Sequence, residues 1–379
     1  MNARVFRRRF WHFLLGPLSR SVNASLLDAG QLSTRGIHRI LVLRPNHRLG
    51  NIILITPLLA ELERLFPGAE IDVLAAGESA REILSGFASV QHVYTLPRHL
   101  LRHLPRVAGT VFSARQVAYD LAVNAATDSY TSRVLLSWVK ARNAIGIPPQ
   151  DSEAPANWAR IMLNAPRHFA TLPVFLVRNA LAAHGDARDM PYPRLDLRLT
   201  RAERRLGRQT LRALLNTTPA TPEVAVIGVF AHATGAKRFE EPWWRRFLNT
   251  LSNRHPECQI VEIVPADGRS HLDERFPAYY SSSLRKLASV IANLHCFVCA
   301  DSGVMHLACA SGTTTIGLFS VTDPLKYAPY GGNNQACDTV GKTPEEIAGF
   351  VADSIDTALG QRAAVTMIST SSSGAASAA

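Results

Sequence analysis

The sequence predicts an α/β protein built from two doubly wound units, each with a parallel sheet. Short runs of β-branched and other apolar residues alternate with amphipathic helical runs, first from residue 37 and again from residue 224. Between the two series lies 216–223, a polar segment with two prolines and no apolar period, which is typical of a linker. At 379 residues the chain is long enough for two separate cores.

The first unit is expected over residues 37–215 and the second over 216–360. In the first, strands are predicted at 38–44, 69–76, 90–96, 119–125 and 141–147, and a helix at 51–66. A capping box, Thr200 with Glu203, starts the last helix of this unit. In the second unit, strands are predicted at 224–232, 258–265, 295–300 and 313–319, with helices at 241–254, 283–293 and 303–311.

The two ends of the chain differ from the rest in composition. Residues 1–36 form a basic amphipathic segment, in which Arg7, Arg8 and Arg9 precede a short apolar stretch around Trp11. That stretch is too short to span a bilayer, so the segment is either an interfacial anchor on an anionic membrane or a disordered basic tail. Residues 361–379 are of low complexity and are predicted to be a disordered tail.

Charge and cysteine content limit the classes of function. Lys and Arg number 41 against 30 Asp and Glu, and this net charge of +11 favours an anionic partner. The basic residues are spread widely without an aromatic platform, which argues against nucleic acid. No GxGxxG follows either first strand, so a dinucleotide-dependent oxidoreductase is disfavoured. The five cysteines, an odd number, suit reduced thiols in the cytoplasm, and the CxxC of Cys296 and Cys299 is weak evidence for a metal.

Parallel sheets bind ligands beyond the carboxyl ends of their strands, and three such loops of the second unit are unusually polar. After the strand that ends at Ala300, the residues Asp301, Ser302 and Gly303 lead into a short helix, whose free N–H groups form a ready phosphate site. His306, one turn in, could reach back toward the same anion. Alternatively, Asp301 or Ser302 only caps the helix and His306 is an ordinary helix residue.

The other two loops carry a cation and a rigid turn. Thr234 and Gly235 suit close approach of a phosphate, and Lys237 is a flexible cation that suits a diphosphate, unless it is simply a solvated surface charge. In the third loop Asp323 and Pro324 are expected to form a turn aimed into the same crevice.

These stretches resemble glycosyltransferase family 9, the heptosyltransferases of lipopolysaccharide core assembly. The strongest resemblance is "ADSGVMHLACASGTTTIGLFSVTDPLKYAPYG" at 300–331, and "HATGAKRF" at 232–239 is similar to the family's diphosphate loop. The opening at 40–74 looks like its first strand, helix and second strand. The resemblance implies the GT-B architecture, two Rossmann-like domains facing a cleft, and an inverting transfer that needs neither metal nor cofactor.

The resemblance also implies roles for residues and partners. Lys237 would take the diphosphate of a nucleotide sugar, ADP-heptose being favoured, with Thr234 and Gly235 beside it. Asp301, Ser302, Gly303 and His306 would cradle the phosphates and sugar, and Asp267 would meet the ribose. The acceptor would be an anionic lipid-linked glycan, and the enzyme would be cytoplasmic, working at the inner face of the inner membrane.

The loop after the first strand departs from the family pattern. The family carries an Asp base where this sequence has Asn51, and an amide cannot accept a proton near neutral pH. Three hypotheses follow. In the first, His47 substitutes as the base. In the second, the diphosphate leaves without a strong base and the acceptor loses its proton late. In the third, the protein binds sugar nucleotide without transferring it, and Asn51 is only a helix cap. Arg44 and Arg48 are expected to bind the acceptor.

Overall fold

The chain divides into two compact α/β units, Met1–Pro193 and Arg194–Ala379. The computed structural model describes residues 30–126, 129–147, 161–181, 190–220 and 224–375. The basic N-terminal segment expected over 1–36 lies mostly outside these residues. In the part that is described, no helix combines the length and apolar character that crossing a bilayer requires.

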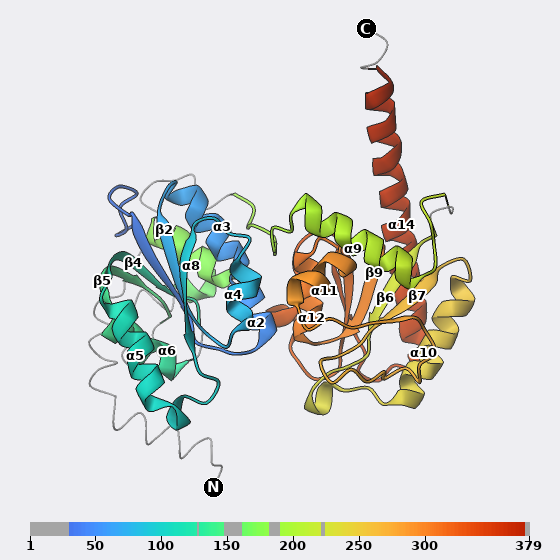
Figure 1. Cartoon of the computed structure of the whole chain (residues 1–379), viewed down its shortest axis with the longest axis horizontal. Coiled ribbons are helices and arrows are strands. Elements are labelled where there is room, and N and C mark those ends of the chain that lie inside the picture. The colour runs from blue at the N-terminus through green and yellow to red at the C-terminus, as the bar shows by residue number, and fades with distance from the viewer. Residues whose placement is uncertain (1–29, 127–128, 148–160, 182–189, 221–223, 376–379) are drawn as a thin grey trace. The chain divides into compact units, whose positions relative to one another are not determined.

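The first unit is a five-stranded parallel sheet in the order β3-β2-β1-β4-β5 (Figure 1). Its strands are β1 (Arg39–Arg44), β2 (Glu70–Ala76), β3 (Val90–Leu96), β4 (Ala118–Asn124) and β5 (Lys140–Ile145). Its helical elements are α2 (Leu49–Ile53), α3 (Thr56–Leu65), α4 (Ser79–Leu84), η1 (Leu100–Arg102), α5 (Leu104–Arg115), α6 (Tyr130–Trp138) and α8 (Leu172–Ala180). The five predicted strands are therefore all confirmed, within two residues at each end.

The helices cover both faces of this sheet, which is why the central strands are apolar on both sides. Leu41 and Leu43 of β1 pack in one cluster with Val111 of α5 and Leu135 of α6. The alternate residues of β1 are equally buried and face the side of α3 and α8.

The helix predicted over 51–66 is wrong as a single element, because the structure forms α2 and α3 with a break between them. Pro57 has no N–H to donate to the carbonyl of Ile53, four residues earlier. The Thr56 hydroxyl donates to that carbonyl instead, at 2.8 Å. Pro57 falls in the first turn of α3, where a missing N–H costs nothing.

The second unit has a six-stranded parallel sheet in the order β11-β10-β9-β6-β7-β8. Its strands are β6 (Val226–Phe230), β7 (Gln259–Ile263), β8 (Ala278–Tyr279), β9 (Cys296–Ala300), β10 (Thr314–Phe319) and β11 (Gln335–Asp338). Its helical elements are α9 (Arg201–Leu214), η3 (Gly235–Lys237), α10 (Glu241–Arg254), α11 (Leu284–Ile291), α12 (Gly303–Ala310), α13 (Pro324–Tyr327) and α14 (Pro344–Ala375). The four predicted strands are present. The edge strands β8 and β11 were not predicted because two and four residues are too few for a period.

Helices α10 and α14 cover one face of the second sheet, and α9 and α11 lie side by side apart from them (Figure 1). Phe247 of α10 and Val351 of α14 share one core with Val229 and Val298 of the sheet. Two ion pairs also join α10 to α14: Arg246 with Glu345, at 2.8 Å, and Arg254 with Asp353, also at 2.8 Å.

Two predicted boundaries differ in the structure. The division falls at Pro193–Arg194 rather than at residue 216, because α9 belongs to the second unit. Glu203 of α9 accepts from the Arg285 guanidinium of α11, and this pairing holds the pKa of Glu203 at about 2.

The tail predicted from 361 is also different, since α14 continues to Ala375. Extending a nucleated helix costs far less than starting one.

Gly207 sets how closely α9 approaches α11. A Cβ on Gly207 would lie 2.0 Å from the carbonyl oxygen of Ser289, which is backbone and cannot rotate away. We expect Gly207→Ala to destabilise the second unit by about 1–3 kcal/mol through overpacking. The matched control is Gly109→Ala on α5, which meets no atom within 4 Å and should stabilise by about 0.4–1 kcal/mol. Thermal unfolding by calorimetry measures both changes, and a neutral Gly207→Ala would contradict the close packing.

Candidate functional site

In the second unit, the loops after the neighbouring strands β6 and β9 meet at one edge of the sheet. Lys237 follows β6 and Asp301 follows β9, and their ammonium and carboxylate groups lie 2.6 Å apart. Asp301 is nearly buried, with 7% of its side chain exposed, whereas Lys237 is 31% exposed. The carboxylate therefore holds the ammonium at the surface end of the pair, where an anionic ligand can reach it.

Helix α12 begins at Gly303, two residues after Asp301, so its free N–H groups point toward the same edge. Its N-cap is Ser302, whose side chain makes no capping hydrogen bond. The Oγ of Ser302 is buried and has no hydrogen-bond partner among the described residues. Gly303 is the first helical residue and has no side chain to obstruct these donors. The start of α12 thus offers a hydroxyl and backbone amides to a ligand that accepts hydrogen bonds.

The loop of Lys237 is fixed from both sides. Thr234 is the N-cap of η3, and Gly235 has φ +65°, a left-handed conformation that glycine adopts without strain. Beyond Lys237, the ring of Phe239 stacks on Trp243 of α10, with ring centroids 4.3 Å apart. Lys237 therefore lies on a short segment that the contact of Phe239 with Trp243 fixes to the core.

The structure also places His306 and Asp323. His306 lies on α12 and is buried, with 3% exposed. Asp323 follows β10, and its carboxylate accepts from the backbone N–H of Leu325 at 3.0 Å, so it caps α13. The third loop thus forms the predicted turn, with its carboxylate used for capping.

The loop after β7 adds residues that the sequence analysis missed. Buried Glu262 accepts from the Ser270 hydroxyl at 2.6 Å and from the His271 backbone N–H at 2.8 Å. The His271 Nε2 lies 3.2 Å from the Nδ1 of His232, in the loop after β6. Burial, followed by the charge of His271, lowers the pKa of His232. The charged Glu262 within a mostly apolar strand is the sequence feature that could have indicated this loop.

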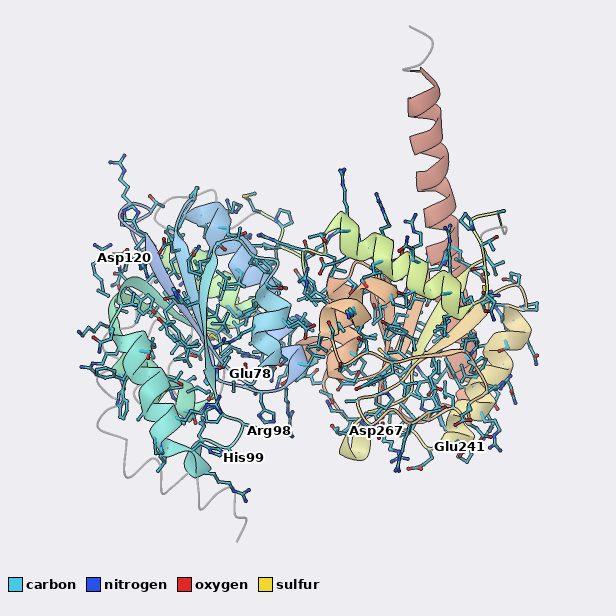
Figure 2. All side chains as sticks on the ribbon, viewed as in Figure 1. Glu78, Arg98, His99, Asp120, Glu241 and Asp267 are labelled. Atoms are coloured by element: carbon cyan, nitrogen blue, oxygen red, sulfur yellow. The ribbon has the colours of Figure 1, made fainter. Side chains whose placement is uncertain are left out.

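Asp267 lies in this same loop and is exposed, with its carboxylate accepting from the Arg269 backbone N–H at 3.2 Å. Its charge acts on His232 and raises the pKa of that ring against the larger effect of burial. Asp267 lies along the same edge of the second unit as Glu241, the first residue of α10 (Figure 2). Asp267 thus lies at the strand-end edge that also carries Lys237, and its contact with a ribose stays a prediction.

In the first unit, the end of β1 holds Asn51 in a fixed orientation. Buried Arg44 donates from Nη2 to the Asn51 Oδ1 at 2.8 Å and from Nε to the Asn51 carbonyl at 3.2 Å, and Nη1 donates to the carbonyl of Ala125. Arg44 was expected to face an acceptor, but its burial and these bonds make it a positioning residue instead. Asn51 lies within α2, whose N-cap is Arg48, so the hypothesis that Asn51 is the helix cap is wrong.

Several exposed basic residues lie at the same edge as Asn51. His47 and Arg48 lie in the loop after β1, and Arg98 and His99 follow β3. Figure 2 shows Arg98 and His99 near Glu78 at this edge, with Asp120 at the opposite one. Burial, then the charges of Arg98, Arg48 and His99, lower the pKa of His47, so its ring is neutral at pH 7. The sequence analysis did not select Arg98 and His99, although their position just after a predicted strand could have indicated them.

Three solved structures with the same fold are glycosyltransferases. The family 9 glycosyl transferase of Veillonella parvula has a TM-score of 0.66 at 16% identity, covering 88% of this chain and 99% of that one. The E. coli heptosyltransferase WaaC with ADP gives 0.62 at 18% identity, covering 83% and 99%. E. coli ADP-heptose LPS heptosyltransferase II gives 0.59 at 18%, covering 86% and 99%. The two parallel-sheet units therefore have the fold of the GT-B class.

The sequence comparison gives the family. The model of glycosyltransferase family 9 (heptosyltransferase) matches residues 113–348, which is more than half of the chain. The chain belongs to glycosyltransferase family 9. Lipopolysaccharide heptosyltransferase 1 of Salmonella typhimurium is 30% identical over 122 residues, a match that covers 29% of this chain and only 37% of that relative.

Lys237 and its neighbour Arg238 allow a matched test of whether this edge binds a diphosphate. Lys237→Ala should weaken binding of inorganic pyrophosphate about 10–100-fold, because it removes a charge-assisted hydrogen bond. Arg238→Ala removes the same charge from an exposed side chain one residue away and should change pyrophosphate affinity far less. Isothermal titration with pyrophosphate measures both. Equal losses would mean that only the general positive charge attracts the anion.

Proposed function

We propose that this protein is an inverting, metal-independent glycosyltransferase. It moves a heptose or a related sugar from a nucleotide-diphosphate donor, with ADP-heptose favoured, to a lipopolysaccharide core or another lipid-linked surface glycan. The observation that carries the proposal is the Lys237–Asp301 pair beside the start of α12, inside the matched family region. Relatives whose names include heptosyltransferase, one of them solved with ADP, support the donor.

The donor half of the reaction needs positive charge at the diphosphate. As the bond between the anomeric carbon and the diphosphate oxygen breaks, the electron pair goes to that oxygen. The ammonium of Lys237 and the N–H groups at the start of α12 stabilise the charge that develops there. A fixed cation and a helix end can do the work that a metal ion does in other transferases, which supports metal independence.

The acceptor half needs a group that removes a proton. The Asn51 amide cannot do so, and its oxygen already accepts from Arg44. We assign this role to His47, which is exposed and has a lowered pKa, so that its ring can take the proton of the acceptor hydroxyl at neutral pH. The deprotonated oxygen attacks the anomeric carbon on the face opposite the diphosphate, which inverts the configuration. Asn51 then serves as a hydrogen-bond donor through its amide nitrogen.

Exposed arginines suit an anionic acceptor. Arg48 and Arg98 lie at the strand-end edge that also carries His47, and their guanidinium groups match phosphate or carboxylate groups of a core glycan. A cytoplasmic protein that works at the inner face of the inner membrane would meet such an acceptor, and the net charge of +11 favours that anionic surface.

A second candidate function rests on Asn51. Because the usual base is absent, the protein could be a binding member of a polysaccharide assembly complex that retains sugar nucleotide without turnover. Incubation with a panel of nucleotide sugars and an acceptor separates the two functions. We expect release of free ADP from ADP-heptose in wild type and loss of release in Lys237→Ala. Binding of ADP-heptose without release would favour the second function.

His47 gives a pH test of the proposed base. A base must be unprotonated, so transfer should fall as pH drops through the lowered pKa of His47, below 6.5, and be flat above it. His47→Ala should lose about 10²–10⁴-fold in kcat and lose this acidic limb. Adding Asn51→Asp should restore part of the rate, because it supplies a carboxylate base.

The control for that test is Arg48→Ala, the next residue in the same loop. It should keep kcat and raise KM for the acceptor, and its acidic limb should remain but move to higher pH, because the charge of Arg48 lowers the pKa of His47. If His47→Ala kept the rate and pH profile of wild type, His47 would not be the base and a late proton loss would be favoured.

A further inference from the structure

A cluster of metal-ligand side chains lies where α10 meets α14, outside the site described above. His255 is the C-cap of α10 and is 5% exposed. Its Nδ1 lies 3.2 Å from the Glu257 Oε1 and 3.8 Å from the Asp356 Oδ1 of α14. The Cys258 Sγ lies 3.6 Å from the same Glu257 oxygen, and the ligand atoms of His255, Glu257 and Cys258 are all within 4.8 Å of one another.

The orientation of His255 leaves one ring nitrogen for a cation. Its Nε2 lies 3.3 Å from the carbonyl oxygen of Ala352, which can only accept, so Nε2 carries the hydrogen and donates. Nδ1 then directs a lone pair toward the carboxylates of Glu257 and Asp356, and a metal ion between these groups would accept that lone pair. Histidine ligands of metals are commonly held in this way, by donation from the other nitrogen to a backbone carbonyl.

The spacing fits a tetrahedral ion. With bonds of about 2.0 Å to nitrogen and oxygen and about 2.3 Å to sulfur, a zinc ion sets its ligand atoms about 3.3–3.6 Å apart. The N···O separation of His255 and Glu257, 3.2 Å, and the S···O separation of Cys258 and Glu257, 3.6 Å, lie close to this range. The N···O separation of His255 and Asp356, 3.8 Å, would have to shorten slightly when the ion binds. We propose that His255, Glu257, Cys258 and Asp356 form a zinc-binding site.

The ligand set favours zinc over the hard cations. A thiol and an imidazole suit Zn²⁺, whereas Mg²⁺ and Ca²⁺ prefer oxygen ligands. Without a metal, the Cys258 thiol donates to Glu257, and burial followed by the charge of Glu257 raises the pKa of Cys258 to about 11. Zinc replaces this proton on sulfur and releases it to solvent.

The position of the site indicates a structural role. His255, Glu257 and Cys258 precede β7, at the amino-terminal edge of the sheet, whereas Lys237 and Asp301 follow strands at the opposite edge. Asp356 lies on α14, beside α10 (Figure 1). Zinc would thus join the end of α10 to α14, adding to the Arg254–Asp353 ion pair one turn away. This inference does not depend on the proposed function.

The full-length protein, stripped of metal with a chelator and dialysed, tests the site. We expect one equivalent of Zn²⁺ by isothermal titration, a rise in Tm when zinc is added, and a thiolate-to-cobalt charge-transfer band with Co²⁺. Cys258→Ser should lose the cobalt band, and Asp356→Asn should weaken zinc binding at least about tenfold. Neither residue is buried, so both variants should fold, which circular dichroism without metal checks.

The matched control is Asp353→Asn, the same change one turn earlier on α14 at another exposed position. It should leave zinc affinity unchanged, although it removes the ion pair with Arg254. Absence of zinc binding to the stripped wild type would overturn the proposal. Unchanged zinc affinity in both Cys258→Ser and Asp356→Asn would overturn it as well.

Discussion

The contact between Lys237 and Asp301 is the interaction on which the candidate site depends. A nearly buried carboxylate is costly unless a cation compensates it, so Asp301 requires the ammonium to stay within reach. The parallel pairing of β6 with β9 makes this possible, because it brings the ends of two strands, about 70 residues apart in sequence, to one edge. This pairing therefore holds the Lys237 ammonium at the edge where α12 begins.

A second constraint acts in the first unit through Arg44. This buried guanidinium donates to the oxygen of Asn51 and so fixes the orientation of its side chain. Arg48 and Arg98 lie at the same edge. Burial, followed by these positive charges, lowers the pKa of His47. Arg44 therefore orients Asn51, while burial and the neighbouring cations act on His47 at the same edge.

The two edges of the second sheet carry different kinds of chemistry. The carboxyl edge holds the polar loops after β6, β7 and β9, with short turns and a glycine at positive φ. The amino edge holds the end of α10, and the ion pairs along α10 and α14 bind these helices to each other. In parallel α/β sheets this separation allows loops to vary for binding while the helices maintain the core.

The sequence by itself determined the α/β class, nine of the eleven strands in the described residues, and the strand-end loops that carry Lys237, Asp301 and His47. It could do so because the spacing of apolar residues and the capping of helices involve residues that are close in sequence, and because the carboxyl ends of parallel strands share one edge. Only the tertiary structure decided that Arg44 is buried against Asn51, that α9 belongs to the second unit, and that His255 meets Asp356. Each of these depends on contacts between segments distant in sequence or on the direction of a side chain, and neither follows from local pattern.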